Sequence, residues 1–171
     1  VLDPETRERI EEPHEIGELA VRYGEDPMLF EEYLGLPEKT AETVQDGWLL
    51  SDDLVSFDED GFFRFHSRAD DIIISSGYRI APKEIEEALL THEAVRNVGV
   101  VGVPHETRGE IPKAFVVLEA GPEPDEDLRT ALQDYVKDRL AKYEYPREVE
   151  FVEELPKTVT GKIRRQSLVD E

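Results

Sequence analysis

A short basic segment late in the chain is the first place where residue types point to chemistry. In a chain with 41 acidic and 20 basic residues, residues 155–165 contain four cations: Lys157, Lys162, Arg164 and Arg165. A positive loop in a negative molecule indicates an anionic target. Gly161 lets the backbone approach a ligand closely, and Lys162 supplies a compact point charge. The other interpretation, a basic tail that neutralises nearby acids, stays open on this segment alone.

An acid and an arginine form the second candidate pair. Asp58 to Gly61 predicts a turn between two apolar-rich runs, which is a hairpin signal. If the turn centres on Glu59 and Asp60, Asp53 lies opposite about residue 66, and Arg68 projects close to Asp53. Together these side chains suit a sugar diol or a nucleotide ribose, because a carboxylate accepts from two hydroxyls and a guanidinium donates in a planar fork. Spacing alone favours a surface salt bridge.

A third stretch, residues 75–86, joins a strand to a helix through Gly77. A glycine after a strand permits a ligand or another chain to pass closely. By itself this stretch predicts only a connection between two elements.

Other chemistries lack the residues that they need. A P-loop requires a glycine where Pro156 stands and a Ser or Thr where Ile163 stands. The four histidines are scattered without ligand spacing, so we expect no metal site. There are no cysteines, which excludes disulfides and a cysteine nucleophile.

The elements that must position these residues follow from hydrophobic periodicity and turn formers. A helix begins at Pro82, and a longer amphipathic helix spans residues 125–142. Residues 104–112 and 155–162 are predicted to be loops, with a short terminal helix after the second. The predicted strands cover residues 18–22, 48–50, 53–57, 62–65, 71–75, 97–103, 113–119 and 148–152.

These elements predict an α+β fold with a boundary near residues 68–70. Residues 1–69 are strand-rich, whereas residues 70–171 contain strands and helices and are long enough to fold alone. We expect the second part to be a short sheet flanked by helices.

The composition limits the partners and the compartment. A formal net charge of −21 disfavours nucleic acids and anionic membrane surfaces. The spread of acids, with arginines outnumbering lysines 13 to 7, favours a protein from a halophile such as a haloarchaeon. No apolar run is long enough for a membrane span, and the N-terminus lacks the pattern of a signal peptide, so the expected location is cytoplasmic. The absence of an initiating Met suggests a piece of a longer chain.

Taken together, three ordered motifs resemble the adenylate-forming superfamily of acyl-CoA synthetases, luciferases and nonribosomal-peptide adenylation domains. Residues 47–53 are similar to that family's Gly-Trp-Tyr-x-Thr-Gly-Asp, residues 68–86 to its hinge motif, and residues 156–162 to its C-terminal lysine motif. The resemblance runs from about Ile16 to the end. Residues 109–118 and 145–151 look most similar to the medium-chain acyl-CoA synthetases.

The resemblance implies a role for each matching residue. Asp53 would bind the ribose hydroxyls of ATP with help from Arg68, and Asp70 would be the hinge about which a small domain rotates. Lys162 would be the catalytic residue that stabilises charge between the acyl carboxylate and the α-phosphate. Four further residues would contact CoA: Gly77, Arg79, Arg108 and Tyr145. At one position the chain departs from the family, since Asp52 replaces a glycine and adds charge beside the expected nucleotide.

The resemblance also implies a reaction and a missing part. A parent enzyme would convert a carboxylic acid, Mg²⁺-bound ATP and CoA into acyl-CoA, AMP and pyrophosphate through an acyl-adenylate. The family's phosphate loop and its Tyr-Gly-x-Thr-Glu motif do not occur here. Residues 1–69 therefore look like part of the final β-barrel subdomain of a large N-terminal domain, and residues 70–171 like the complete lid. The isolated chain is then expected to be inactive. Two alternatives remain: a non-catalytic docking module, and an adenylating enzyme whose acceptor is a carrier-protein thiol.

The halophile hypothesis predicts stabilisation by salt. Because salt screens repulsion among surface carboxylates, the melting temperature should rise across a KCl series. A melting temperature that does not rise with KCl would remove the hypothesis.

Overall fold

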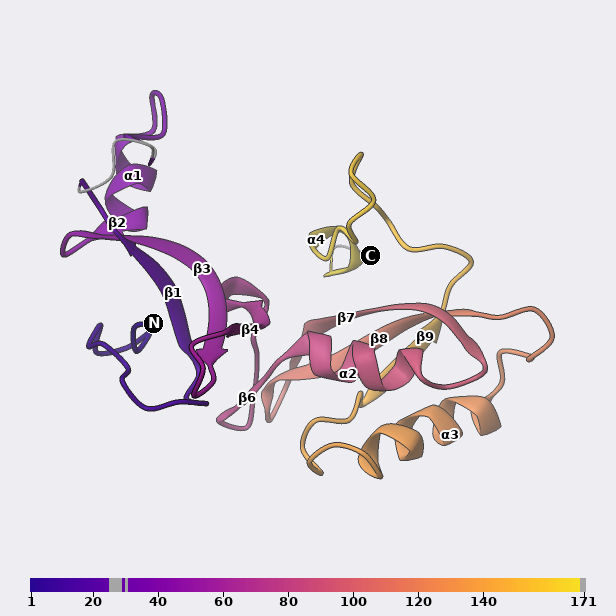
Figure 1. Ribbon diagram of the computed structural model, residues 1–171. Coiled ribbons are helices and arrows are strands. Elements are labelled where there is room, and N and C mark those ends of the chain that lie inside the picture. The colour runs from indigo at the N-terminus through magenta and orange to yellow at the C-terminus, as the bar shows by residue number, and fades with distance from the viewer. Residues whose placement is uncertain (25–28, 30, 170–171) are drawn as a thin grey trace. The chain divides into compact units, whose positions relative to one another are not determined.

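The chain forms two compact units, described here from a computed structural model. The N-terminal unit is Val1–Asp70 and the C-terminal unit is Asp71–Glu171 (Figure 1). The structure describes residues 1–24, 29 and 31–169. The assignment of the two units to a large domain and a lid stays a prediction.

The N-terminal unit is built on a four-stranded antiparallel sheet around one long strand, β3 (Trp48–Phe57). Strand β3 pairs with each of the other three: β1 (Gly17–Arg22), β2 (Val44–Gln45) and β4 (Phe63–Arg68). One helix, α1 (Pro37–Thr43), precedes β2. The two short runs expected at residues 48–50 and 53–57 are therefore one continuous strand.

Two tight turns set the register of this sheet. Asp46 and Gly47 both have positive φ, of 50° and 79°, as a two-residue hairpin loop between β2 and β3 requires. The predicted hairpin over Asp58 to Gly61 is confirmed: the Gly61 N–H donates to the Asp58 carbonyl at 3.0 Å, and Gly61 has a φ of 84°. The pairing is centred on Asp60, and a register shift between Leu54 and Val55 adds one more residue, so Asp53 lies opposite Arg68 rather than residue 66.

The C-terminal unit contains a five-stranded sheet with strands in the order β6-β5-β8-β7, and β9 pairs in parallel with β8. A 3₁₀ turn at Ala69–Asp71 precedes β5, so the strand expected at residues 71–75 is shorter. The strands are β5 (Ile73–Ser75), β6 (Tyr78–Ile80), β7 (Val95–His105), β8 (Gly109–Leu118) and β9 (Glu148–Phe151). The helices are α2 (Pro82–Leu90), α3 (Glu126–Lys137) and α4 (Gln166–Val169). This mixture of helices and sheet confirms the predicted α+β class.

Both faces of this sheet are buried, which explains the continuous apolar run in β8. On one face, Ala114 and Val116 pack in a core with residues of α2 and α3, among them Ile85 and Leu132. On the other face the core contains Val101, Phe115, Val117, Leu155 and Leu168. Since successive residues of a strand point to opposite faces, helices cover one side and the C-terminal segment covers the other. Figure 1 shows α3 and α4 on opposite sides of this sheet.

Two expectations about the C-terminal unit were wrong. The loop predicted at residues 104–112 is mostly strand, with pairing that continues to His105 opposite Gly109. Pro104 is tolerated there because β7 is an edge strand, where a missing N–H breaks no ladder. The helix predicted to reach residue 142 ends at Lys137, where the Arg139 N–H bonds the Val136 carbonyl and tightens the last turn.

None of the described helices is long and apolar enough to cross a membrane.

The packing on the faces of this sheet predicts how truncating a buried or an exposed leucine changes stability. Leu132 of α3 is fully buried, whereas Leu90 at the end of α2 is 48% exposed. Leu132→Ala should lower the free energy of unfolding by about 2–5 kcal/mol, and Leu90→Ala by about 0.5 kcal/mol or less. Urea unfolding followed by circular dichroism measures both. Equal losses would contradict the assigned packing.

Candidate active site

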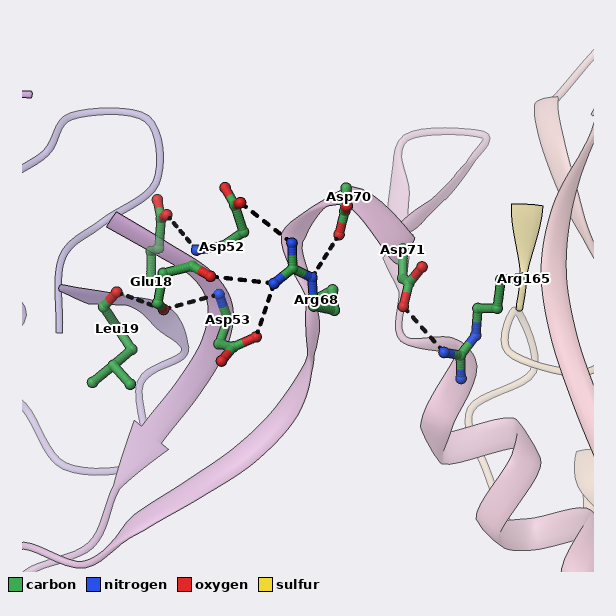
Figure 2. A network of polar contacts seen from close by, with 9 residues as sticks. Glu18, Leu19, Asp52, Asp53, Arg68, Asp70, Asp71 and Arg165 are labelled. Atoms are coloured by element: carbon green, nitrogen blue, oxygen red, sulfur yellow. Dashed lines mark hydrogen bonds and ion pairs between the residues drawn. The ribbon is translucent and has the colours of Figure 1, made fainter. Parts of the chain in front are cut away.

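Arg68 is the centre of a cluster of carboxylates in the N-terminal unit. Its Nη1 lies 3.5 Å from Asp53 Oδ1, its Nη2 3.3 Å from Asp52 Oδ2, and its Nε 3.1 Å from Asp70 Oδ1 (Figure 2). Nη1 also donates to the Ser51 carbonyl at 3.3 Å. The structure therefore brings together three sequence-predicted residues: Asp53, Arg68 and Asp70. Sequence spacing predicted that Asp53 lies near Arg68, but not that Asp52 and Asp70 also bind this arginine.

The electrostatics of this cluster are those of a partly exposed network. The hydrogen bond to Asp70 is the main cause that raises the pKa of Arg68 above its ordinary value; the charges of the three aspartates act in the same direction, and burial opposes them. The side chain of Arg68 is 41% exposed and that of Asp53 is 35% exposed. Exposed pairs of this kind contribute about 1 kcal/mol or less each. The Asp53 carboxylate is thus held by the arginine but still reachable from solvent.

Hydrogen bonds from neighbouring strands fix the backbone around Asp53. Ser51 Oγ donates to the Leu19 carbonyl at 2.8 Å and accepts from the Asp53 N–H at 3.1 Å. The Asp52 N–H donates to Glu18 Oε1 at 3.1 Å. Glu18 is only 4% exposed and is paired with Arg7. The serine hydroxyl therefore fixes the backbone of β3 beside the predicted ribose-binding residue.

The conformation of Asp52 accounts for its departure from the family pattern. Its φ is 59°, in the left-handed region where glycine is unstrained and where Asp is among the better tolerated residues. An aspartate can therefore replace the family's glycine without a change of backbone conformation at this point of β3. Its carboxylate is 62% exposed and pairs with Arg68.

A separate candidate, within the C-terminal unit, is a hairpin at residues 157–163, which we call the lysine hairpin. Lys157 and Ile163 form an isolated β-bridge at its base. The Thr158 N–H donates to the Lys162 carbonyl at 2.8 Å, and the Lys162 N–H donates to Thr158 Oγ1 at 3.1 Å. Gly161 has a φ of 86°, which the turn requires. The loop predicted from sequence is therefore a turn closed by hydrogen bonds between Thr158 and Lys162.

Apolar side chains anchor the lysine hairpin to the sheet. Leu155 and Leu168 are buried on either side of it, and Ile163 packs against them. They lie over Gly99 of β7, where an added Cβ would come within 3.1 Å of Leu168 and 3.4 Å of Ile163. Gly99 thus leaves room for the segment to seat closely on the strand.

Lys162 itself is exposed, and its ammonium has no hydrogen-bond or ion-pair partner within the part of the chain that the structure describes. By contrast, Lys113 and Lys137 form ion pairs at 2.8 Å. A lysine on an anchored turn that no nearby acid neutralises is available to an external anion.

The four residues predicted to contact CoA fall into two groups. Ser76 and Gly77 form the turn between β5 and β6 with φ of 51° and 84°, and Arg108 bonds both the Ser76 hydroxyl, at 3.1 Å, and the Ser76 N–H, at 2.8 Å. Gly77 and Arg108 therefore belong to one corner of the sheet, which has open space where a Gly77 Cβ would lie. Arg79 follows on β6 and is exposed.

Tyr145 forms the second group: its hydroxyl accepts from Arg147 at 2.9 Å, and the Lys137 ammonium lies 4.5 Å from its ring centroid.

Tyr143 joins this corner, although sequence reasoning missed it. Its ring stacks on Tyr78 with centroids 4.2 Å apart and planes 13° from parallel, and both rings are partly exposed. The sequence feature that could have identified Tyr143 is the pair of tyrosines, at 143 and 145, on either side of Glu144. Burial raises the pKa of Glu144, the Ala141 N–H acts in the opposite direction, and the charge of Glu84 adds to the rise.

No group of three or more metal-binding side chains occurs among the described residues.

Comparison with known proteins places this geometry in a family. Residues 84–162 match the model of the AMP-binding enzyme C-terminal domain. The chain is 50% identical over 159 residues to the acyl-coenzyme A synthetase ACSM4, mitochondrial, of Rattus norvegicus, which covers 91% of this chain and 27% of the relative. The chain belongs to the adenylate-forming superfamily of acyl-CoA synthetases.

Solved structures of the superfamily share the fold. An ATP-bound chimera, RpMatB-BxBclM B1, matches 99% of this chain and 33% of its own with a TM-score of 0.92 and 37% identity. The o-succinylbenzoate CoA synthetase of Bacillus subtilis, in complex with its acyl-adenylate intermediate, matches 94% of this chain and 31% of its own with a TM-score of 0.80 and 35% identity. The chain thus spans about a third or less of the length of the relatives it matches.

The left-handed conformation at position 52 yields a matched pair of variants. Asp52→Gly should leave the free energy of unfolding unchanged or raise it slightly, because glycine adopts this φ without strain. Asp52→Val should lower it by about 1–2 kcal/mol, the cost of a left-handed β-branched residue. Chemical denaturation of both variants measures the difference. Similar stability for the two would show that position 52 does not hold this conformation.

Proposed function

We propose that this chain is the C-terminal part of an AMP-forming acyl-CoA synthetase, and that its C-terminal unit is a lid whose catalytic residue is Lys162. The parent enzyme would activate a carboxylic acid with ATP, release pyrophosphate, and transfer the acyl group from AMP to the thiol of CoA. Two findings support the proposal: the similarity to acyl-CoA synthetases, and a lysine hairpin that presents an unpaired ammonium from an anchored base.

The role proposed for Lys162 follows from charge. When an acyl carboxylate attacks the α-phosphorus of ATP, negative charge concentrates on the oxygens around that phosphorus. An ammonium fixed nearby stabilises this charge more than it stabilises the separated substrates, and such an interaction accelerates the step. Lys162 suits the task because no described carboxylate competes for its charge.

Asp53 and Arg68 are proposed to hold the nucleoside. The Asp53 carboxylate is partly exposed and can accept hydrogen bonds from two neighbouring ribose hydroxyls, while Arg68 keeps it oriented. Asp70, bonded to the same arginine, is proposed as the hinge residue. Magnesium would enter bound to the phosphates of ATP.

The corner formed by Gly77 and Arg108 is proposed to contact CoA in the second half-reaction. Open space above Gly77 suits a narrow chain such as pantetheine. Arg79 is exposed beside the corner and supplies positive charge suited to phosphate groups. Tyr145 is proposed to reach CoA as well, from the loop that precedes β9.

Lys162→Ala in the complete enzyme tests the proposal. Adenylation, measured as pyrophosphate release, should fall by about 10²-fold or more because one charge-stabilising group is lost. Formation of thioester from supplied acyl-adenylate should largely survive. Lys157→Ala, at the base of the same hairpin, removes the same charge and serves as the control; it should retain most of the adenylation activity.

Equal loss of both half-reactions in Lys162→Ala would contradict the role assigned to this lysine. So would an equal loss of adenylation in the Lys157 control.

A further inference from the structure

Arg165, close behind Lys162 in the sequence, binds two carboxylates from distant parts of the C-terminal unit. Its Nη2 lies 2.8 Å from both oxygens of Glu86, on α2, and its Nη1 lies 3.2 Å from Asp71 Oδ2. Figure 2 shows the pair of Asp71 and Arg165. One guanidinium thus connects the first residue of the unit, a helix and the C-terminal segment.

The burial of Glu86 explains why this carboxylate needs the Arg165 guanidinium close to it. Glu86 is only 9% exposed, and its Oε1 also accepts the Val100 N–H of β7 at 2.9 Å. A buried carboxylate is strongly destabilising without a cation close to it. Arg165 is therefore held where Glu86 lies, whereas the neighbouring Arg164 is exposed and has no ion-pair partner in the described part of the chain.

The position of Arg165 in the chain transmits this constraint to the lysine hairpin. The Arg164 N–H bonds the Pro156 carbonyl at 2.8 Å, and Ile163 bridges Lys157, so the hairpin closes immediately before Arg165. The Arg165 carbonyl accepts from the Leu168 N–H at 2.9 Å, at the start of α4. The hairpin base then has an apolar anchor over Gly99 and a polar anchor on Glu86.

We propose that Arg165 is a positioning residue for Lys162: its bonds to Glu86 and Asp71 fix the base of the lysine hairpin and so hold the ammonium in one place relative to the sheet. Apolar contacts alone allow the segment to slide, because they have no preferred direction. A guanidinium bonded to two carboxylates fixes direction as well as distance. The catalytic consequence rests on the function proposed above, but the structural clamp does not.

Amide hydrogen exchange in the 171-residue chain tests the clamp without any assay of activity. In Arg165→Lys the charge remains, but an ammonium cannot reproduce the bonds of the planar fork. Exchange of the Lys162 and Arg164 amides should become about 10-fold faster or more, since the hairpin opens locally. Arg164→Lys is the matched control and should exchange like the parent, and amides of β8 should be unchanged in both variants.

A second variant, which leaves Arg165 in place, shows whether an effect of Arg165→Lys comes from the lost bond to Glu86 or from the new lysine. Glu86→Gln keeps the size of the side chain and removes its charge, so it should accelerate exchange at the same two amides. Unchanged exchange at these amides in both Arg165→Lys and Glu86→Gln would overturn the proposal.

Kinetics of the complete enzyme separate positioning from simple loss of folded protein. Arg165→Lys should lower kcat for adenylation by about 10-fold and leave the KM for ATP within about twofold, because the misplaced group acts only in the transition state. Thioester formation from supplied acyl-adenylate should stay within about twofold of the parent. Equal loss in both half-reactions would overturn the positioning role.

The two proposals fail in different ways. If Lys162→Ala retained adenylation, the function proposed for the hairpin would fall, whereas accelerated exchange in Arg165→Lys would still establish the clamp.

Discussion

The structure of the C-terminal unit depends on one constraint: the sheet is apolar on both faces, so both must be covered. Ala114 and Val116 face the helices, while Phe115 and Val117 face the other way. The segment after β9 supplies the second cover through Leu155 and Leu168. Because the hydrophobic effect drives this burial, the lysine hairpin, which lies between those two leucines, is brought to the sheet by the same packing that completes the core.

The cations of this acidic chain divide into two kinds by their surroundings. Arg68 lies among three aspartates and Arg165 between a glutamate and an aspartate. These arginines organise structure, since their charge is already matched. Lys162 differs because no described acid is bonded to its ammonium. The formal net charge of −21 repels anions overall, so an unmatched cation on this turn gives an approaching anion a local site of attraction.

Sequence patterns predicted the parts of this protein that depend on local chemistry. Pro82 and Asp125 marked the starts of α2 and α3: Pro82 is the first residue of α2, and Asp125 caps α3 by accepting the Leu128 N–H at 2.8 Å. The turn over Asp58 to Gly61 and the proximity of Asp53 to Arg68 also followed from residue types and spacing.

Features that depend on distant residues were not predictable in the same way. The register shift beside Leu54 that sets Asp53 opposite Arg68 has no signal in the residues around it. The stacking of Tyr143 on Tyr78 and the bonds of Arg165 to Glu86 and Asp71 join residues far apart in the sequence. Hydrophobic periodicity describes one element at a time, so it cannot report which elements meet.

The contact between Arg165 and Asp71 spans 94 positions of the chain, and this separation has a consequence for folding order. Strands β7 and β8 are joined by a short turn and can pair early, because closing a short loop loses little entropy. Contacts between the C-terminal segment and the sheet close far longer loops and so lose more chain entropy. They stabilise the unit only after the strands have formed. The hairpin with Lys162 should therefore be the last part of the unit to reach its native position, so a refolding molecule regains its sheet before its lysine is in place.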